Sequence, residues 1–374
     1  HGAAAAHERI MILESITLEN FRSAERECIH FDPGVNLLYG NNAEGKTNVL
    51  EAIYFFARGR SFRTTRESDL VRFGAEGCGV DISFTRRGEE ETLGYRYFGG
   101  TRRRTKNGVK VTAREALGVF CAVLFCPDHL SVIKRTPAER REFLNAAIAQ
   151  ISPAYVAALG RHKKLLENKN ALLRCEDGFD RALMESYNEE LAAVSAEILV
   201  ARRAYLERLC ASAMRTVAEI SGGREHVTID YSCDIPAEIS RKEDVTIAYR
   251  DLFRANLARE AAARMTLFGV QRDDLVFFVN GREAKQFASQ GQQRSIALAL
   301  KLGEGEILAK EIGEEPVYLL DDVLGELDEE RKSYILSRTG GRQLIVTACE
   351  KNDYDTLVGV KKIRVCGGHY TEDR

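Results

Sequence analysis

The feature that most constrains the fold is a glycine-rich loop of the form G-x-x-x-x-G-K-T, made by Gly40-Asn41-Asn42-Ala43-Glu44-Gly45-Lys46-Thr47. An apolar run, residues 35–39, comes before the loop, and a helical apolar pattern follows it. In such a loop, backbone N–H groups surround a phosphate, the lysine contacts the terminal phosphates and the threonine hydroxyl binds Mg²⁺. The sequence therefore predicts a nucleotide site in which Lys46 is catalytic and Thr47 is a metal ligand.

Composition narrows the class of protein further. The chain has 374 residues, 44% of them hydrophobic, which is enough for a large core divided between two lobes. No apolar stretch approaches the roughly 18 residues that span a bilayer, so we expect a cytoplasmic protein with no membrane contact. The nine cysteines contain no C-x-x-C pair and the seven histidines no i, i+4 pair. These spacings give little support for a zinc site or a disulfide framework.

Hydrophobic periodicity divides the chain into three segments. Residues 11–136 carry short apolar runs and an Asn107-Gly108 turn, which predict strands and an antiparallel meander. From residue 137 the period becomes helical, in two runs separated at residues 175–178, so an antiparallel helical pair is expected. We predict the domains as 11–136, the first part of an ATPase head; 137–265, a helical lobe; and 266–374, the second part of the head.

Two motifs in the last segment are of the kinds that accompany a glycine-rich loop in a nucleotide site. The apolar run at residues 317–320 ends in Asp321 and Asp322. In a P-loop site, Asp321 would hold Mg²⁺ and Asp322 would orient or deprotonate the attacking water. Upstream, an anion site is expected at the start of a helical pattern, in Ser289-Gln290-Gly291-Gln292-Gln293-Arg294. Taken alone, the two acids could simply end a strand and the serine could simply cap a helix.

The glycine-rich loop, the serine motif (residues 289–294) and the strand that ends in Asp321 and Asp322 occur in the order found in ABC-type ATPases. Together with residues 19–23, 60–63, 125–128, 140–144 and 272–275, they resemble the RecF family of bacterial recombination-mediator ATPases. The resemblance extends over residues 11–366. It implies an α/β fold, an ABC-type and SMC-like P-loop ATPase head with an inserted, mostly helical second lobe.

The resemblance also implies the cofactors and the assembly. ATP and Mg²⁺ would bind at the loop, and ATP would favour a homodimer. In that dimer, Ser289, Gly291 and Gln292 of one subunit would close on the phosphates held by Lys46 and Thr47 of the other. Residues 325–328 would lie at the dimer interface.

Further roles follow from the same resemblance. Arg22 would approach the nucleotide phosphates. The family binds double-stranded DNA and single-strand/duplex junctions, works with RecO and RecR, and helps to load RecA in recombinational repair, replication restart and the SOS response. We expect Arg60, Arg63 and Arg66 to contact DNA, because they follow the helix after the loop; the simpler interpretation is that they are solvated surface arginines.

Some positions depart from the family pattern. The switch histidine of ABC-type ATPases should follow residues 344–347, where Ala348 and Cys349 stand. Gly325 replaces a usual serine, and Val270-Gln271 replaces a usual Pro-His pair. Slow hydrolysis is consistent with the missing histidine, and with the family resemblance we expect a weak DNA-dependent ATPase.

The sequence leaves three alternative functions open. A nucleotide-binding subunit of an ABC transporter shares the three motifs, but it would carry the switch histidine and no two-helix insertion. A P-loop kinase predicts an acceptor pocket and no serine motif. A passive DNA-binding module with a vestigial ATPase differs only in its activity.

Overall fold

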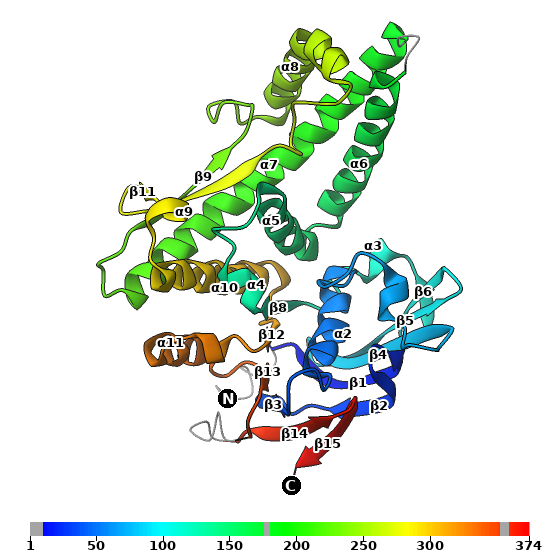
Figure 1. The fold of residues 1–374 in the computed structure, drawn as a ribbon, viewed down its shortest axis with the longest axis vertical. Helices are drawn as coiled ribbons and strands as arrows, with labels where there is room; N and C mark the ends of the chain where they lie inside the picture. Colours follow the sequence, from blue (N-terminus) through cyan, green and yellow to red (C-terminus); the bar gives the residue numbers. More distant parts are fainter. Residues whose placement is uncertain (1–9, 176–179, 352–358, 374) are drawn as a thin grey trace.

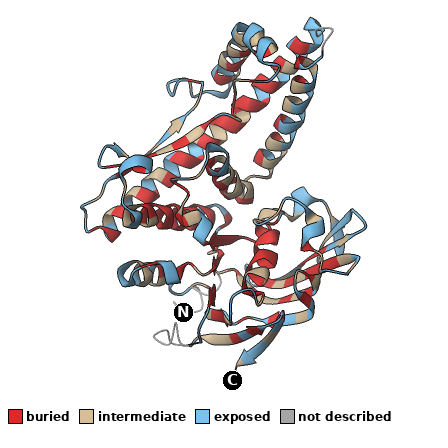
Figure 2. Cartoon of the chain, in the orientation of Figure 1, coloured by how far each residue is buried: buried red, intermediate tan, exposed pale blue. Residues whose placement is uncertain are grey.

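The computed structural model describes residues 10–175, 180–351 and 359–373. An α/β head occupies one end of the molecule and a mostly helical lobe the other (Figure 1). Buried residues run through both parts and through α10 (Gln290–Ile312), which lies where the two parts meet (Figure 2). Among the described residues, none of the helices has the length and hydrophobicity that a membrane span requires.

The sheet that carries the glycine-rich loop is mostly parallel. Its strand order is β15-β14-β3-β13-β12-β8, and β15 pairs antiparallel at one edge. Strands β8, β12 and β13 are buried along their whole length, which explains why their sequences are continuous apolar runs. The strands are β3 (Val35–Tyr39), β8 (Ala122–Phe125), β12 (Val317–Leu320), β13 (Leu344–Ala348), β14 (Lys361–Cys366) and β15 (His369–Asp373).

The second sheet of the head is the predicted antiparallel meander. Its order is β2-β1-β4-β5-β6-β7, and the Asn107-Gly108 turn joins β6 to β7 with positive φ at both residues. Helix α2 (Lys46–Arg58) contacts this sheet through Phe55, whose ring lies 4.5 Å from that of Tyr95. The strands are β1 (Ile12–Phe21), β2 (Ala24–His30), β4 (Gly77–Arg86), β5 (Glu89–Phe98), β6 (Thr101–Lys106) and β7 (Val109–Val111).

The lobe is built on one long helix. Helix α7 (Arg181–Ile220) has 40 residues and spans about 60 Å. It packs against α6 (Pro153–Leu173), α8 (Lys242–Ala263) and α10. Residues 176–178 of the predicted break lie outside the described residues. The lobe also contains α5 (Pro137–Ile151) and a three-stranded sheet of β9 (Val227–Ser232), β10 (Asp274–Val279) and β11 (Arg282–Glu283).

Because β10 pairs with β9, strands on either side of residue 265 share one sheet. The division of the chain at 136/137 and 265/266 remains our proposal. The short elements are η1 (Glu67–Leu70), α3 (Ala113–Ala116), α4 (Pro127–Leu130), α9 (Ala284–Phe287), η2 (Leu324–Glu326) and α11 (Glu329–Thr339).

A buried arginine ties α7 to the segment that leads into β10. Arg202 Nε donates to Tyr155 Oη at 2.9 Å, and its NH1 donates to Val270 O at 2.8 Å. The same guanidinium lies 3.4 Å from Asp273 Oδ2, and both side chains are almost fully buried. A buried charge is stable only when it is paired and hydrogen-bonded. These contacts therefore fix the chain just before β10.

We predict that Arg202→Met lowers the free energy of unfolding by about 3–5 kcal/mol, since it leaves the buried Asp273 carboxylate without its ion-pair partner. Denaturant unfolding monitored by circular dichroism measures the change. The matched control is Arg161→Met, which breaks the more exposed pair with Glu197 and should cost about 1 kcal/mol or less. Equal losses in the two variants would contradict the assignment.

Candidate nucleotide-binding site

The glycine-rich loop connects β3 to α2 and is shaped by contacts with β14 and β15. A Cβ at Gly40 would lie 2.2 Å from the carbonyl oxygen of Val365, so only glycine fits there. The carbonyl of Glu44 accepts from Gly368 N, and that of Gly45 accepts from Tyr370 Oη, both at 3.0 Å. The end of the β-sheet therefore supports the backbone of the loop.

Lys46 starts α2 and folds back over the loop. Its side chain is buried, and Nζ donates to Gly40 O at 2.6 Å and to Asn41 O at 3.2 Å. The ammonium group therefore lies within the loop that is expected to surround a phosphate. Backbone carbonyls are its partners here, as expected for a buried cation that needs hydrogen bonds.

Thr47 and the two acids meet at the carboxyl edge of the parallel sheet. Thr47 Oγ1 donates to Asp321 Oδ1 at 2.9 Å. Asp322 adopts a left-handed conformation with φ 51°, and its N–H donates to Thr347 Oγ1 at 2.8 Å. Thr347 Oγ1 lies 3.0 Å from Asp321 Oδ1 and 3.3 Å from Asp322 Oδ1. Thr347 thus orders both carboxylates, a role that sequence analysis missed.

These groups suit a magnesium ion. Mg²⁺ prefers hydroxyl and carboxylate oxygens together with phosphate, and Thr47 and Asp321 already place such oxygens in contact. Burial raises the pKa of the Asp321 carboxyl above its ordinary value, while hydrogen bonds from Thr47 and Thr347 lower it. A cation next to this buried carboxylate would favour its ionised form.

Arg22 lies beside the loop helix and is held by a glutamate. Its Nε and NH2 donate to the two carboxylate oxygens of Glu51 at 2.9 and 2.6 Å. Glu51 is fully buried on α2, where it also accepts from Ser61 Oγ and, at 3.3 Å, from Arg63 NH1. The signal for this role in the sequence is a single glutamate within an apolar helical run.

Within one chain, the serine motif (residues 289–294) stands apart from the site formed by the glycine-rich loop and the two acids. Ser289 caps α10: its Oγ accepts from Gln292 N at 3.2 Å, and its N–H donates to Gln292 Oε1 at 2.9 Å. Ser289 is exposed, and within the described residues no hydrogen bond links it to Lys46 or Thr47. Gly291 packs tightly, because a Cβ there would lie 3.3 Å from Arg331 NH2.

The three candidate DNA-binding arginines have different surroundings. Arg60 pairs with Glu142 of α5, and Arg63 NH1 donates to Asn48 Oδ1 at 2.9 Å in addition to its contact with Glu51. Arg66 is exposed, and its side chain forms no ion pair with any residue in the described ranges. The structure therefore does not gather them into one free cluster.

Cys349 occupies the place where a switch histidine was sought. Its Sγ donates to Asn42 Oδ1 at 3.2 Å and lies 4.0 Å from Lys46 Nζ. A thiol therefore faces the glycine-rich loop. A Cβ added at Gly325 would meet no atom within 4 Å, so the serine usual in the family would fit there.

The chain is similar to known proteins over most of its length. Residues 12–367 match the family described as RecF/RecN/SMC N terminal domain. The chain is 38% identical over 334 residues to the DNA replication and repair protein RecF of Geobacillus kaustophilus, covering 87% of this chain and 89% of the relative. It is 39% identical over 351 residues to RecF of Symbiobacterium thermophilum, covering 92% of each chain.

The chain belongs to the RecF family of DNA replication and repair proteins. A solved structure described as the recombination mediator protein RecF-ATP in the RecFOR pathway superposes with a TM-score of 0.91 and 35% identity, covering 98% of both chains. The related RecF-ATPrS structure gives 0.92, with 98% of this chain and 99% of that one covered. The resemblance inferred from the motifs is confirmed.

The fold class is confirmed as well. An Smc head domain from Pyrococcus furiosus with an extended coiled coil superposes with a TM-score of 0.56 at 18% identity, covering 97% of this chain and 96% of that one. At that identity the likeness concerns the fold alone: an ABC-type, SMC-like ATPase head. Membership of the RecF family also argues against the ABC-transporter alternative.

We predict that Glu51→Gln lowers the free energy of unfolding by about 2 kcal/mol, because it weakens the charged hydrogen bonds to Arg22 and Arg63. Thermal and denaturant unfolding measure the loss. Glu142→Gln, which weakens more exposed pairs with Arg58 and Arg60, serves as control and should cost about 1 kcal/mol at most. If Glu51→Gln were as stable as wild type, its contacts would not hold the arginines in place.

Proposed function

We propose that this protein is an ATP-operated DNA clamp. ATP and Mg²⁺ bind at the glycine-rich loop, the bound nucleotide favours a homodimer, and the dimer grips duplex or gapped DNA until hydrolysis releases it. The contact between Thr47 Oγ1 and Asp321 Oδ1 at 2.9 Å supports this proposal most directly. It joins two residues 274 positions apart in the sequence whose oxygens would hold Mg²⁺ in a P-loop ATPase.

Each group at the site takes a role that its geometry permits. Backbone N–H groups of residues 40–47 would surround the phosphates, and Lys46 would exchange its carbonyl contacts for terminal phosphate oxygens. Thr47 and Asp321 would hold Mg²⁺, which neutralises phosphate charge when it is bound. Asp322 would orient or deprotonate the attacking water. Arg22 would reach the phosphates only by giving up its contacts with Glu51.

A homodimer would bring the serine motif to the glycine-rich loop, which it does not contact within the described part of one chain. The exposed N-terminus of α10 presents Ser289, Gly291 and Gln292 without a contact to Lys46 or Thr47 of the same chain, as far as the described residues go. N–H groups at a helix N-terminus bind anions. The N–H groups of Ser289 and Gln292 bond to each other's side chains here, and they would exchange these partners for the γ-phosphate held by a second copy. ATP drives dimerisation only to the extent that the dimer binds ATP more tightly than the monomer.

DNA would be held mainly through its phosphates. Arg66 has no ion-pair partner among the described residues and would bind them directly, whereas Arg60 and Arg63 would exchange carboxylate partners for phosphate. Such binding is sensitive to salt and selects weakly for sequence. Because Cys349 stands in place of the switch histidine, hydrolysis would be slow, in keeping with a weak DNA-dependent ATPase.

The pathway is also part of the proposal. The RecF structures that resemble this chain are described as belonging to a RecFOR pathway. We infer that this protein works in the cytoplasm with RecR and RecO at single-strand/duplex junctions, and indirectly assists the loading of RecA during recombinational repair and replication restart.

Analytical ultracentrifugation tests the clamp. With ATP and Mg²⁺ at moderate salt, wild type should shift from monomer to dimer, whereas Lys46→Met and Ser289→Arg should stay monomeric. Lys46→Met removes the phosphate contact, and Ser289→Arg places a bulky cation at the closing surface. Ser240→Arg, an exposed serine of the lobe, is the matched control and should dimerise. The clamp mechanism is wrong if the mass of wild type does not change with ATP, with or without duplex DNA.

Thr347→Val tests the ordering of the two acids. The variant keeps the side-chain shape but removes the hydroxyl that holds Asp321 and accepts from Asp322 N–H. If the lost hydrogen bond raises the activation free energy of hydrolysis by about 1.4 kcal/mol, ATP hydrolysis becomes about tenfold slower. ATP affinity without Mg²⁺ should be unchanged, and Thr347→Ser should restore the rate. Equal rates in the valine and serine variants would argue against the role of the hydroxyl.

A further inference from the structure

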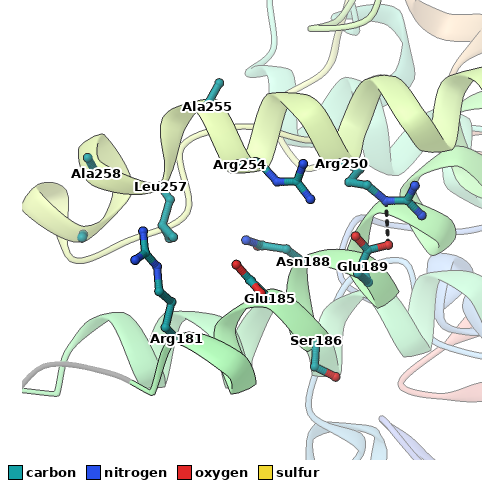
Figure 3. A pocket seen from close by; sticks show the side chains of 11 residues that line it. Arg181, Glu185, Ser186, Asn188, Glu189, Arg250, Arg254, Ala255, Leu257 and Ala258 are labelled. Carbon is teal, nitrogen blue, oxygen red and sulfur yellow. Dashed lines mark hydrogen bonds and ion pairs between the residues drawn. The ribbon is translucent and has the colours of Figure 1, made fainter.

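A cavity lies in the helical lobe, between α7 and α8. Figure 1 shows α8 at the end of the molecule opposite the head that carries the glycine-rich loop. The cavity has a volume of about 590 Å³ and opens between the first turns of α7 and the C-terminal half of α8 (Figure 3). Its wall on α8 includes Ala258 and Ala261, whose side chains are short and fill little of the space beside them. This volume is in the range of ligand sites in proteins.

Two arginines point into the cavity from opposite helices. Arg181 projects from α7 and Arg254 from α8 (Figure 3). Neither forms an ion pair with a residue in the part of the chain that the structure describes. By contrast, Arg250 is neutralised by Glu189 through a hydrogen bond of 2.7 Å. Both arginines are exposed, so their guanidinium groups are accessible to an anionic side chain that enters the cavity.

A buried amide provides an independent sign of a ligand. Asn188 is only 7% exposed, and its side chain extends into the cavity between the two arginines (Figure 3). Its Oδ1 is buried without a hydrogen-bond partner, and no described residue bonds to the rest of the amide. Buried polar groups in native proteins are nearly always hydrogen-bonded. A side-chain amide is matched well by a peptide group, which offers one donor and one acceptor.

We propose that this cavity binds an acidic peptide segment of a partner protein. Arg181 and Arg254 hold a carboxylate of the segment, and Asn188 bonds to its backbone. A neighbouring apolar side chain packs on Leu257 and the alanines of α8. The site does not depend on the proposed ATP and DNA functions.

The lining favours a peptide over nucleic acid. Glu189 is paired with Arg250, but Glu185 lines the same cavity and would repel an unbroken run of phosphates, whereas a peptide can place an uncharged side chain beside it. Double-stranded DNA carries a charge about every 1.7 Å and is recognised along an extended basic surface. A space enclosed by two helices instead admits single side chains and a short stretch of extended backbone.

Fluorescence anisotropy with the full chain tests the site. The probe is a fluorescein-labelled peptide of alternating leucine and glutamate, and its matched control has glutamine in place of glutamate. We expect the acidic peptide to bind at least tenfold more tightly than the glutamine peptide. Arg254→Glu and Ala258→Trp should each weaken its binding at least tenfold, because the first reverses the charge and the second fills the cavity.

Two further variants separate the site from general effects. Asn188→Leu keeps a side chain of similar size and should weaken binding of the acidic peptide, whereas Arg241→Glu, next to the start of α8 but outside the cavity, should not. The proposal is overturned if both peptides bind equally, or if Arg254→Glu leaves the affinity unchanged. It is also overturned if a labelled duplex oligonucleotide, and no peptide, loses affinity in Arg254→Glu.

The same variants distinguish this proposal from the clamp. Ala258→Trp changes an exposed position, so the lobe should fold, and ATP-dependent dimerisation should match wild type. If dimerisation fails in wild type while the acidic peptide still binds, the clamp is wrong and the peptide site stands. If dimerisation succeeds and the peptide does not bind, the reverse holds.

Discussion

The parallel pairing of β3, β13 and β12 is the constraint on which the rest of the head depends. Parallel strands end at the same edge of a sheet, so the loop after β3 and the acids after β12 meet there although they lie far apart in the sequence. β13 lies between them and ends with Thr347 and Ala348; the Thr347 hydroxyl spans the gap between the two acids. A change in strand order would separate these groups even if every motif were kept.

Buried charges then set how the other parts attach to this sheet. Glu51 joins α2 to Arg22 of the preceding hairpin and to Arg63 of the following segment. Arg202 does the same in the lobe, where it joins α7 to the segment before β10. Each charge is removed from water and therefore needs several partners in fixed positions. Such clusters make the relative placement of their elements specific as well as stable.

Much of this architecture was predictable, because its signals are local. The glycine spacing of the loop, the apolar run before Asp321 and the Asn107-Gly108 turn each occupy a few consecutive residues, and the motifs in combination indicated the family. The roles of Glu51, Arg202 and Thr347 were not predicted, because their partners lie at distant positions in the chain and no spacing rule connects them. The cavity between α7 and α8 escaped for a similar reason, since it depends on how two helices pack and not on a motif.

The contacts of the glycine-rich loop with β14 and β15 have a consequence for the order of assembly. Gly40 lies against Val365, and the carbonyl of Gly45 accepts a hydrogen bond from Tyr370. The residues that support the loop therefore follow it by more than 300 positions in the sequence. During synthesis the loop emerges early, but its supporting strands emerge only after the helical lobe has been made. A nascent chain therefore cannot hold its phosphate site in the final shape until β14 and β15 have left the ribosome.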